Sequence, residues 1–185
     1  MTRIIGGVAR GRPIRVPPGG GTRPTSDRAR EGLFNTLASL VELRGARFAD
    51  LYAGSGAVGF EALSRGASHV LFVDQSAAAV RTLHANATAL EFAGVEILSR
   101  PVQHVMEITP ECAFDAVFLD PPYALPDALL TEVLTGLVSG AWLEPDGVCV
   151  VERSRRSGPP VWPDGLITIR NRAYGEGVLW YGSGS

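Results

Sequence analysis

The stretch Asp50-Leu51-Tyr52-Ala53-Gly54-Ser55-Gly56-Ala57-Val58-Gly59 follows an apolar run and precedes a helical pattern. Its glycines fit G-x-G-x-x-G, the turn that joins a strand to a helix and lets the backbone come close to a ligand. We expect Gly54 and Gly56 to form this turn and Gly59 to allow close contact between the helix and a strand. Dinucleotide sites and S-adenosylmethionine (SAM) sites share the pattern, so it indicates a cofactor that carries a nucleoside.

On both sides of this turn, apolar strand-like runs alternate with helical patterns. Strands apolar on both faces and separated by helices predict a parallel sheet covered on both sides. Two last runs, 166–170 and 178–181, flank a loop with glycines and predict an antiparallel hairpin. The fold class is therefore α/β and Rossmann-like. The expected strands are 48–53, 70–74, 95–99, 114–120 and 147–152, and the expected helices are 28–40 after Thr25 or Ser26, 57–65, 76–90, a short one after Pro101, and 127–138.

Composition and charge restrict the class of protein further. The 185 residues are 45% hydrophobic, which fits one globular body with a substantial core. The net charge is only −2, but residues 1–30 hold seven arginines and one acid, whereas residues 31–150 hold five arginines and fifteen acids. A basic N-terminal arm beside an acidic body favours a polyanionic partner. We place this arm at residues 1–24 and the folded domain at residues 25–185.

Several other classes of protein are not expected. The first residues have no apolar segment typical of a secretion signal, and no run of ~18 apolar residues could span a membrane. Cys112 and Cys149 lie far apart and match no metal or redox spacing, so we expect reduced thiols in a cytoplasmic protein. No zinc-binding or Ser/His/Asp pattern is present, and we expect no metal.

Two acids select between the candidate cofactors. Asp74 ends the second strand, where a carboxylate can accept hydrogen bonds from both ribose hydroxyls of a nucleoside. Asp50 lies three residues before the Ala-Gly-Ser-Gly turn, where it would repel a pyrophosphate but attract the sulfonium and ammonium groups of SAM. The alternative is that Asp50 only caps the end of a strand. We expect SAM, and residues 25–185 are then a SAM-dependent methyltransferase domain.

The tetrapeptide Asp120-Pro121-Pro122-Tyr123 follows the fourth strand, at the edge where open parallel sheets bind ligands. The prolines fix the backbone and leave carbonyls without a partner in the sheet. A base could stack on Tyr123 while its exocyclic amine donates to the Asp120 carboxylate and the Pro121 carbonyl. This arrangement favours methyl transfer to an amine, because it places the lone pair of the nitrogen in line with the methyl group. A prolyl turn without function is the alternative.

With these motifs in place, the sequence resembles the bacterial RsmD-type 16S ribosomal RNA guanine-N2 methyltransferases over nearly its whole length. Tyr123 stands where phenylalanine is frequent in that family. The matching stretches are Arg3-Ile4-Ile5-Gly6-Gly7, Arg10-Gly11-Arg12, Thr22-Arg23-Pro24-Thr25-Ser26-Asp27-Arg28, Arg30-Glu31, Leu33-Phe34-Asn35, Asp50 through Gly59 with Glu61-Ala62-Leu63, and Asp120-Pro121-Pro122-Tyr123.

The resemblance implies a seven-stranded SAM-dependent methyltransferase fold, a role in the cytoplasm, and methylation of one guanine N2 amine in 16S ribosomal RNA or a small-subunit assembly intermediate. One compact domain without an obvious exposed apolar stripe favours a monomer. The alternatives are a DNA adenine-N6 or cytosine-N4 methyltransferase, a SAM-binding assembly module without catalysis, and a nicotinamide oxidoreductase. Arginines of the arm would contact RNA phosphates. The candidate residues are Asp120, Pro121, Pro122 and Tyr123 for catalysis; Arg23, Pro24, Thr25, Asp50, Ala53, Gly54, Ser55, Gly56, Gly59, Asp74, Gln75, Pro101 and Val102 for SAM; and Arg10, Arg12, Arg15 and Arg28 for RNA.

Overall fold

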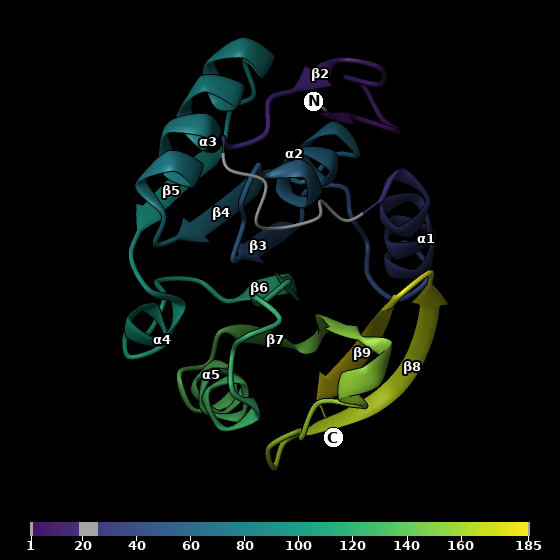
Figure 1. Ribbon diagram of the computed structural model, residues 1–185, viewed down its shortest axis with the longest axis vertical. Helices are drawn as coiled ribbons and strands as arrows, with labels where there is room; N and C mark the ends of the chain where they lie inside the picture. Colours follow the sequence, from purple (N-terminus) through teal and green to yellow (C-terminus); the bar gives the residue numbers. More distant parts are fainter. Residues whose placement is uncertain (1, 19–25, 185) are drawn as a thin grey trace.

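A seven-stranded sheet forms the centre of the computed structural model, which describes residues 2–18 and 26–184. The five neighbouring strands β5, β4, β3, β6 and β7 are parallel, whereas β9 is antiparallel to both β7 and β8. The predicted parallel sheet with a terminal hairpin is confirmed (Figure 1). The order is β5-β4-β3-β6-β7-β9-β8, with β3 at Arg47–Leu51, β4 at His69–Asp74, β5 at Val95–Ser99, β6 at Phe114–Leu119, β7 at Leu143–Ser154, β8 at Leu166–Tyr174 and β9 at Gly177–Gly184.

Helices cover both faces of the sheet and bury one apolar cluster on each side (Figure 1). Helices α1 (Asp27–Leu37), α2 (Ala57–Ser64) and α3 (Ala77–Leu90) contribute to one cluster, and α4 (Val102–Val105) and α5 (Asp127–Ser139) contribute to the other. A short 3-10 helix, η1 (Arg155–Ser157), follows β7. In the part of the chain that the structure describes, no helix is long and apolar enough to cross a membrane.

Helix boundaries follow local chemistry. The Ser26 hydroxyl accepts a hydrogen bond from the N–H of Ala29 and begins α1, and Ser76 does the same for Ala79 at the start of α3. The predicted end of α1 at residue 40 is wrong, because the helix stops at Leu37. The predicted hairpin strands are too short, since exposed polar residues continue the edge strand β8 to Tyr174.

The N-terminal residues pack onto the body of the protein. Strands β1 (Thr2–Arg3) and β2 (Pro13–Ile14) form an antiparallel hairpin, and Ile4 and Ile14 are buried in the cluster of α1, α2 and α3. The fully buried carboxylate of Glu61 accepts the backbone N–H groups of Ile5 and Gly6, both at 2.8 Å. The hairpin is therefore fixed to α2. The predicted boundary between residues 24 and 25 falls outside the described residues.

We predict that Glu61→Ala destabilises the protein by about 3 kcal/mol or more, because it leaves two buried N–H groups without an acceptor and removes the 2.7 Å ion pair with Arg65. Urea unfolding followed by circular dichroism measures the change. Glu31→Ala, on the exposed side of α1, is the control and should change stability by less than about 0.5 kcal/mol. Equal unfolding midpoints for the two variants would contradict the role assigned to Glu61.

Candidate active site

The glycine-rich turn and the Asp-Pro-Pro-Tyr turn meet at one point of the sheet. Strands β4 and β5 continue from β3 in one direction, and β6 lies on the other side of β3. Such a reversal of strand order opens a crevice at the carboxyl ends of the two central strands, where α/β proteins bind ligands. Leu51 pairs with Leu119, so the segments that follow β3 and β6 emerge side by side.

The glycine-rich turn has the geometry that its sequence predicts. Gly54 and Gly56 have φ values of 55° and 75°, in the left-handed region that favours glycine. A Cβ atom at Gly59 would lie 2.3 Å from the Phe72 ring, which confirms that this glycine allows α2 to pack closely on β4. A Cβ atom at Gly54 would meet no atom of the described residues within 4 Å. The side of the turn at Gly54 is therefore open to a ligand.

Asp74 connects the end of β4 to this turn. One of its carboxylate oxygens accepts the N–H of Gly54 at 2.8 Å, and the other accepts the N–H of Ser76 at 2.8 Å. The acid predicted for the ribose and the glycines predicted for the turn are thus in direct contact. Since each carboxylate oxygen has two lone pairs, Asp74 can accept further hydrogen bonds from hydroxyl groups.

Asp50 lies beneath the turn and not on its surface. Asp50 is 2% exposed, and its carboxyl group accepts a hydrogen bond from the N–H of Gly59 at 2.9 Å. Burial, and to a lesser extent the charge of Asp74, raise the pKa of Asp50 to about 8, although the bond from Gly59 opposes this shift. Two neighbouring carboxyl groups at one turn favour a cationic cofactor, as SAM is, and disfavour a pyrophosphate. Asp50 therefore supports the first turn of α2, and its carboxyl group stays protonated in the folded protein up to a pH of about 8.

Asn86 joins the N-terminal hairpin to the same turn. This α3 residue is 1% exposed, and its amide oxygen accepts the N–H of Arg15 at 2.9 Å. Its amide nitrogen donates to the carbonyl oxygens of Arg15 and Ser55, both at 3.0 Å. Sequence reasoning missed Asn86, because an asparagine within a helical pattern gives no signal of contacts across the fold.

Asp120 and the residues after it form the second part of the site. The N–H of Asp120 donates to the carbonyl of Leu51 at 3.4 Å, which keeps the tetrapeptide beside the end of β3. Burial, followed by the charges of Glu152 and Asp50, raises the pKa of Asp120 well above its ordinary value. Tyr123 is 71% exposed, so its ring offers an accessible aromatic face.

An open pocket lies next to the tetrapeptide. An ion pair of 2.6 Å between Asp127 and Arg153 joins two of its lining residues. Glu152 and Arg153 were not predicted, although a charged residue at the end of an apolar strand is the same signal that identified Asp74. The lining residues are Pro121, Pro122, Tyr123, Leu125, Asp127, Leu130, Glu152, Arg153, Ser154 and Ser157.

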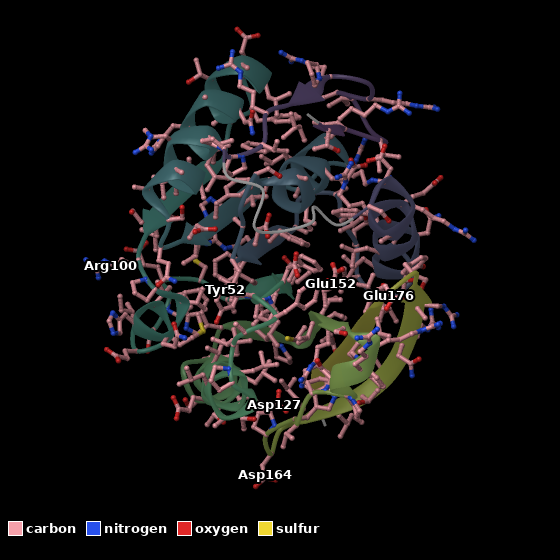
Figure 2. The ribbon with its side chains drawn as sticks, in the orientation of Figure 1. Tyr52, Arg100, Asp127, Glu152, Asp164 and Glu176 are labelled. Carbon is pink, nitrogen blue, oxygen red and sulfur yellow. The ribbon has the colours of Figure 1, made fainter. Side chains whose placement is uncertain are left out.

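Tyr52 is a further residue that the sequence did not reveal. It has φ 63°, unusual for a tyrosine, at the junction of β3 and the turn. Its hydroxyl group is buried without a hydrogen-bond partner among the described residues, and burial raises its pKa to about 12. Backbone strain of this kind is concentrated at functional sites. Figure 2 shows Tyr52 and Glu152 in the middle part of the molecule, between the groups of helices.

The other predicted residues have varied positions. Gln75 is exposed beside Asp74, Pro101 precedes α4, and Val102 is buried in the core on the α4 side. The Arg12 side chain donates to the carbonyls of Ala89 and Leu90 at the end of α3, so it has a structural role there. All four candidates for RNA binding are exposed, namely Arg10, Arg12, Arg15 and Arg28. The cofactor candidates Arg23, Pro24 and Thr25 lie outside the described residues.

The sheet order, the glycine-rich turn with its acids, and the Asp-Pro-Pro-Tyr turn together define a SAM-dependent methyltransferase with a Rossmann-like fold. Residues 2–183 match the protein family described as Conserved hypothetical protein 95, and the chain belongs to this family.

Relatives of known name and structure agree with this assignment. The chain is 35% identical to YlbH of Bacillus subtilis (strain 168), over 97% of each chain. It is also 35% identical to Ribosomal RNA small subunit methyltransferase D of Escherichia coli (strain K12), over 94% of this chain and 85% of that one. The solved structure of the Escherichia coli protein yhhF has a TM-score of 0.88 and 32% identity, covering 100% of this chain and 98% of the other.

We predict that Asp50→Asn gains stability relative to the parent protein as the pH rises from about 4 to about 8. The folded state of the parent holds a proton on Asp50 up to pH of about 8, whereas an unfolded aspartate loses it near 3.8, so burial of the charged form costs stability in this window. The difference should grow by at most about 1.4 kcal/mol per pH unit.

Urea unfolding of both proteins between pH 4.5 and 8.5 tests this prediction. Asp164→Asn, an exposed residue in the segment before β8, is the matched control and should follow the parent protein at every pH (Figure 2). A constant difference between Asp50→Asn and the parent would show that Asp50 is ionised throughout.

Proposed function

We propose that this protein transfers a methyl group from SAM to the exocyclic N2 amine of a guanine in 16S ribosomal RNA. The observation that carries the proposal is the pairing of β3 with β6, which brings a cofactor turn and an Asp-Pro-Pro-Tyr turn to one crevice. The relative from Escherichia coli (strain K12) is named for small-subunit ribosomal RNA, and this name supports the choice of substrate. The expected partner is 16S ribosomal RNA, either free or within a small-subunit assembly intermediate.

The cofactor site is formed by the turn and its acids. The bound SAM supplies an activated methyl group on a positively charged sulfur atom. Asp74 accepts hydrogen bonds from the ribose hydroxyls, and the backbone of residues 53–56 contacts the cofactor at the side of Gly54. Asp50 lies buried beneath the turn, where a positively charged group bound nearby would favour its ionised form. By the family resemblance, we assign Arg23, Pro24 and Thr25 to the methionine end of the cofactor and Gln75, Pro101 and Val102 to its adenosine end.

The target base is held by the tetrapeptide. The ring of Tyr123 stacks on the base, and the carboxylate of Asp120 and the carbonyl of Pro121 accept the two hydrogens of the amine. Accepting both hydrogens moves the nitrogen lone pair out of conjugation with the ring, which makes the amine a better nucleophile. Pro122 restricts the backbone so that these acceptors keep their direction. Asp120 also lies where it can take the proton that the methylated amine releases.

The RNA itself is held by arginines outside the pocket. Arg10, Arg15 and Arg28 are exposed and can contact phosphates, which position an RNA without reading its sequence. Selection of the nucleotide then depends on an unpaired base that can leave its stack and enter the pocket. We further propose that the protein works as a monomer in the cytoplasm and without a metal.

Incubation with labelled SAM tests the proposed function. The substrates are naked 16S RNA and small subunits from a strain that lacks this protein, and nucleoside analysis should find N2-methylguanine. Asp120→Ala should lower the turnover by about 100-fold or more with SAM affinity nearly unchanged, because it removes an acceptor that acts on the amine. Asp146→Asn, an exposed carboxyl group before the buried part of β7, is the control. Label in DNA, or SAM binding without transfer to any nucleic acid, would contradict the proposal.

We predict that the double variant Arg15→Gln, Arg28→Gln binds RNA more weakly and with a lower salt dependence. Each phosphate contact that is lost should reduce the slope of log affinity against log salt by about 1. Arg44→Gln is the control, because Arg44 is exposed in the segment before β3, at the opposite edge of the sheet from the site. Filter binding between 50 and 300 mM salt gives the slopes, and identical slopes for the three proteins would exclude Arg15 and Arg28 from the RNA contact.

A further inference from the structure

Glu152 and Asp120 occupy matching positions on neighbouring strands. Leu119 on β6 pairs with Val151 on β7, and the two strands are parallel. The residues that follow them, Asp120 and Glu152, are therefore level with each other. Side chains alternate between the two faces of a strand. Because Phe118 and Val150 both lie in the core cluster of α1, α2 and α3, Asp120 and Glu152 share that face of the sheet.

The surroundings of Glu152 also place this residue beside the tetrapeptide. Glu152 lines this pocket together with Pro121, Pro122 and Tyr123. A Cβ atom at Gly177 would lie 2.9 Å from a carboxylate oxygen of Glu152, so the glycine that begins β9 leaves room for this group. Figure 2 shows Glu152 toward the centre of the molecule and Glu176 farther out at the hairpin.

The proximity of two acids has an electrostatic cost. The charge of Glu152 is, after burial, the largest cause of the raised pKa of Asp120. A neutral side chain at position 152 would avoid this repulsion. Carboxyl groups with strongly perturbed pKa values are typical of functional sites.

We propose that Glu152 recognises the N1–H group of the target guanine and thereby excludes adenine and cytosine. This inference rests on the proposed function and deepens it. The Watson–Crick edge of guanine presents N1–H and the N2 amine as adjacent donors, and ionised carboxylates are acceptors only. With the amine on Asp120 and Pro121, the neighbouring N1–H faces Glu152. Adenine has an unprotonated N1 and cytosine an unprotonated N3 beside the amine, and their lone pairs would be directed at the carboxylate.

Replacement of the target guanine by 2-aminopurine tests the recognition of N1. This base keeps the 2-amino group, but its N1 is an acceptor. The two RNAs differ only at that nucleotide. Both are tested either as naked RNA or within assembled subunits, whichever form the enzyme methylates when the nucleotide is guanine. The parent protein should prefer guanine in kcat/KM by about 100-fold or more, because a site built for a donor rejects an analogue that lacks it.

Glu152→Gln should reduce this preference to within about 10-fold, since an amide can accept from N1–H of guanine or donate to N1 of 2-aminopurine. Its kcat/KM for guanine should fall by about 10- to 100-fold. Glu176→Gln, the exposed acid at the β8–β9 turn, should keep the preference of the parent. SAM affinity and the unfolding midpoint of each variant identify any general loss of structure.

Three results would overturn the inference. The parent protein could methylate both RNAs with similar kcat/KM, and this comparison requires no variant. Glu152→Gln could lower both rates by the same factor, which would leave Glu152 with a structural role only. If the parent protein forms no N2-methylguanine in the unmodified RNA, the proposed function itself fails, and the recognition of N1 fails with it.

Discussion

The parallel pairing of β3 with β6 is the constraint on which the site depends. These strands are distant in the chain but adjacent in the sheet, with Asp50 opposite Phe118 and Leu51 opposite Leu119. A shift of one residue would turn every side chain of β6 to the other face. It would place Phe118 away from its cluster and Asp120 on the side of α4 and α5. The burial of the apolar residues therefore fixes the direction of the acids at the ends of the strands.

Charge is separated across the molecule in a way that suits two different ligands. The carboxyl ends of β3, β4, β6 and β7 bring Asp50, Asp74, Asp120 and Glu152 to one edge of the sheet. The N-terminal hairpin and the start of α1 carry exposed arginines instead. A cationic cofactor is attracted to the first region and a polyanion to the second. Because the acids are recessed and the arginines are exposed, phosphates can be bound without entering the acidic crevice.

Local chemistry made part of this structure predictable. The glycine pattern located the turn, Ser26 and Ser76 marked helix starts, and the strand pattern placed Asp74 at the end of the second strand. These features depend on residues close in sequence or on a single βαβ unit, whose geometry is nearly constant.

Features that depend on strand order could not be predicted in the same way. The sequence does not reveal that residues 120 and 152 are level with each other, because this follows from the pairing of β6 with β7. In the sequence Arg12 does not differ from the other basic residues near the N-terminus. Only the fold shows that its side chain donates to a carbonyl group at the end of α3. Asp50 was expected to face the cofactor, but the N–H of Gly59 holds its carboxylate under the turn.

The amide of Asn86 makes the N-terminal hairpin and the glycine-rich turn parts of one cooperative unit. Its three hydrogen bonds reach Arg15 on one side and Ser55 on the other, and each is worth about 1 kcal/mol. Neither segment can move far without leaving a buried polar group without a partner. Local opening of the hairpin is therefore also loss of order at the cofactor turn. Hydrogen exchange at the N–H of Arg15 and at the N–H of Gly56, which donates to Ala53 within the turn, should then report the same event.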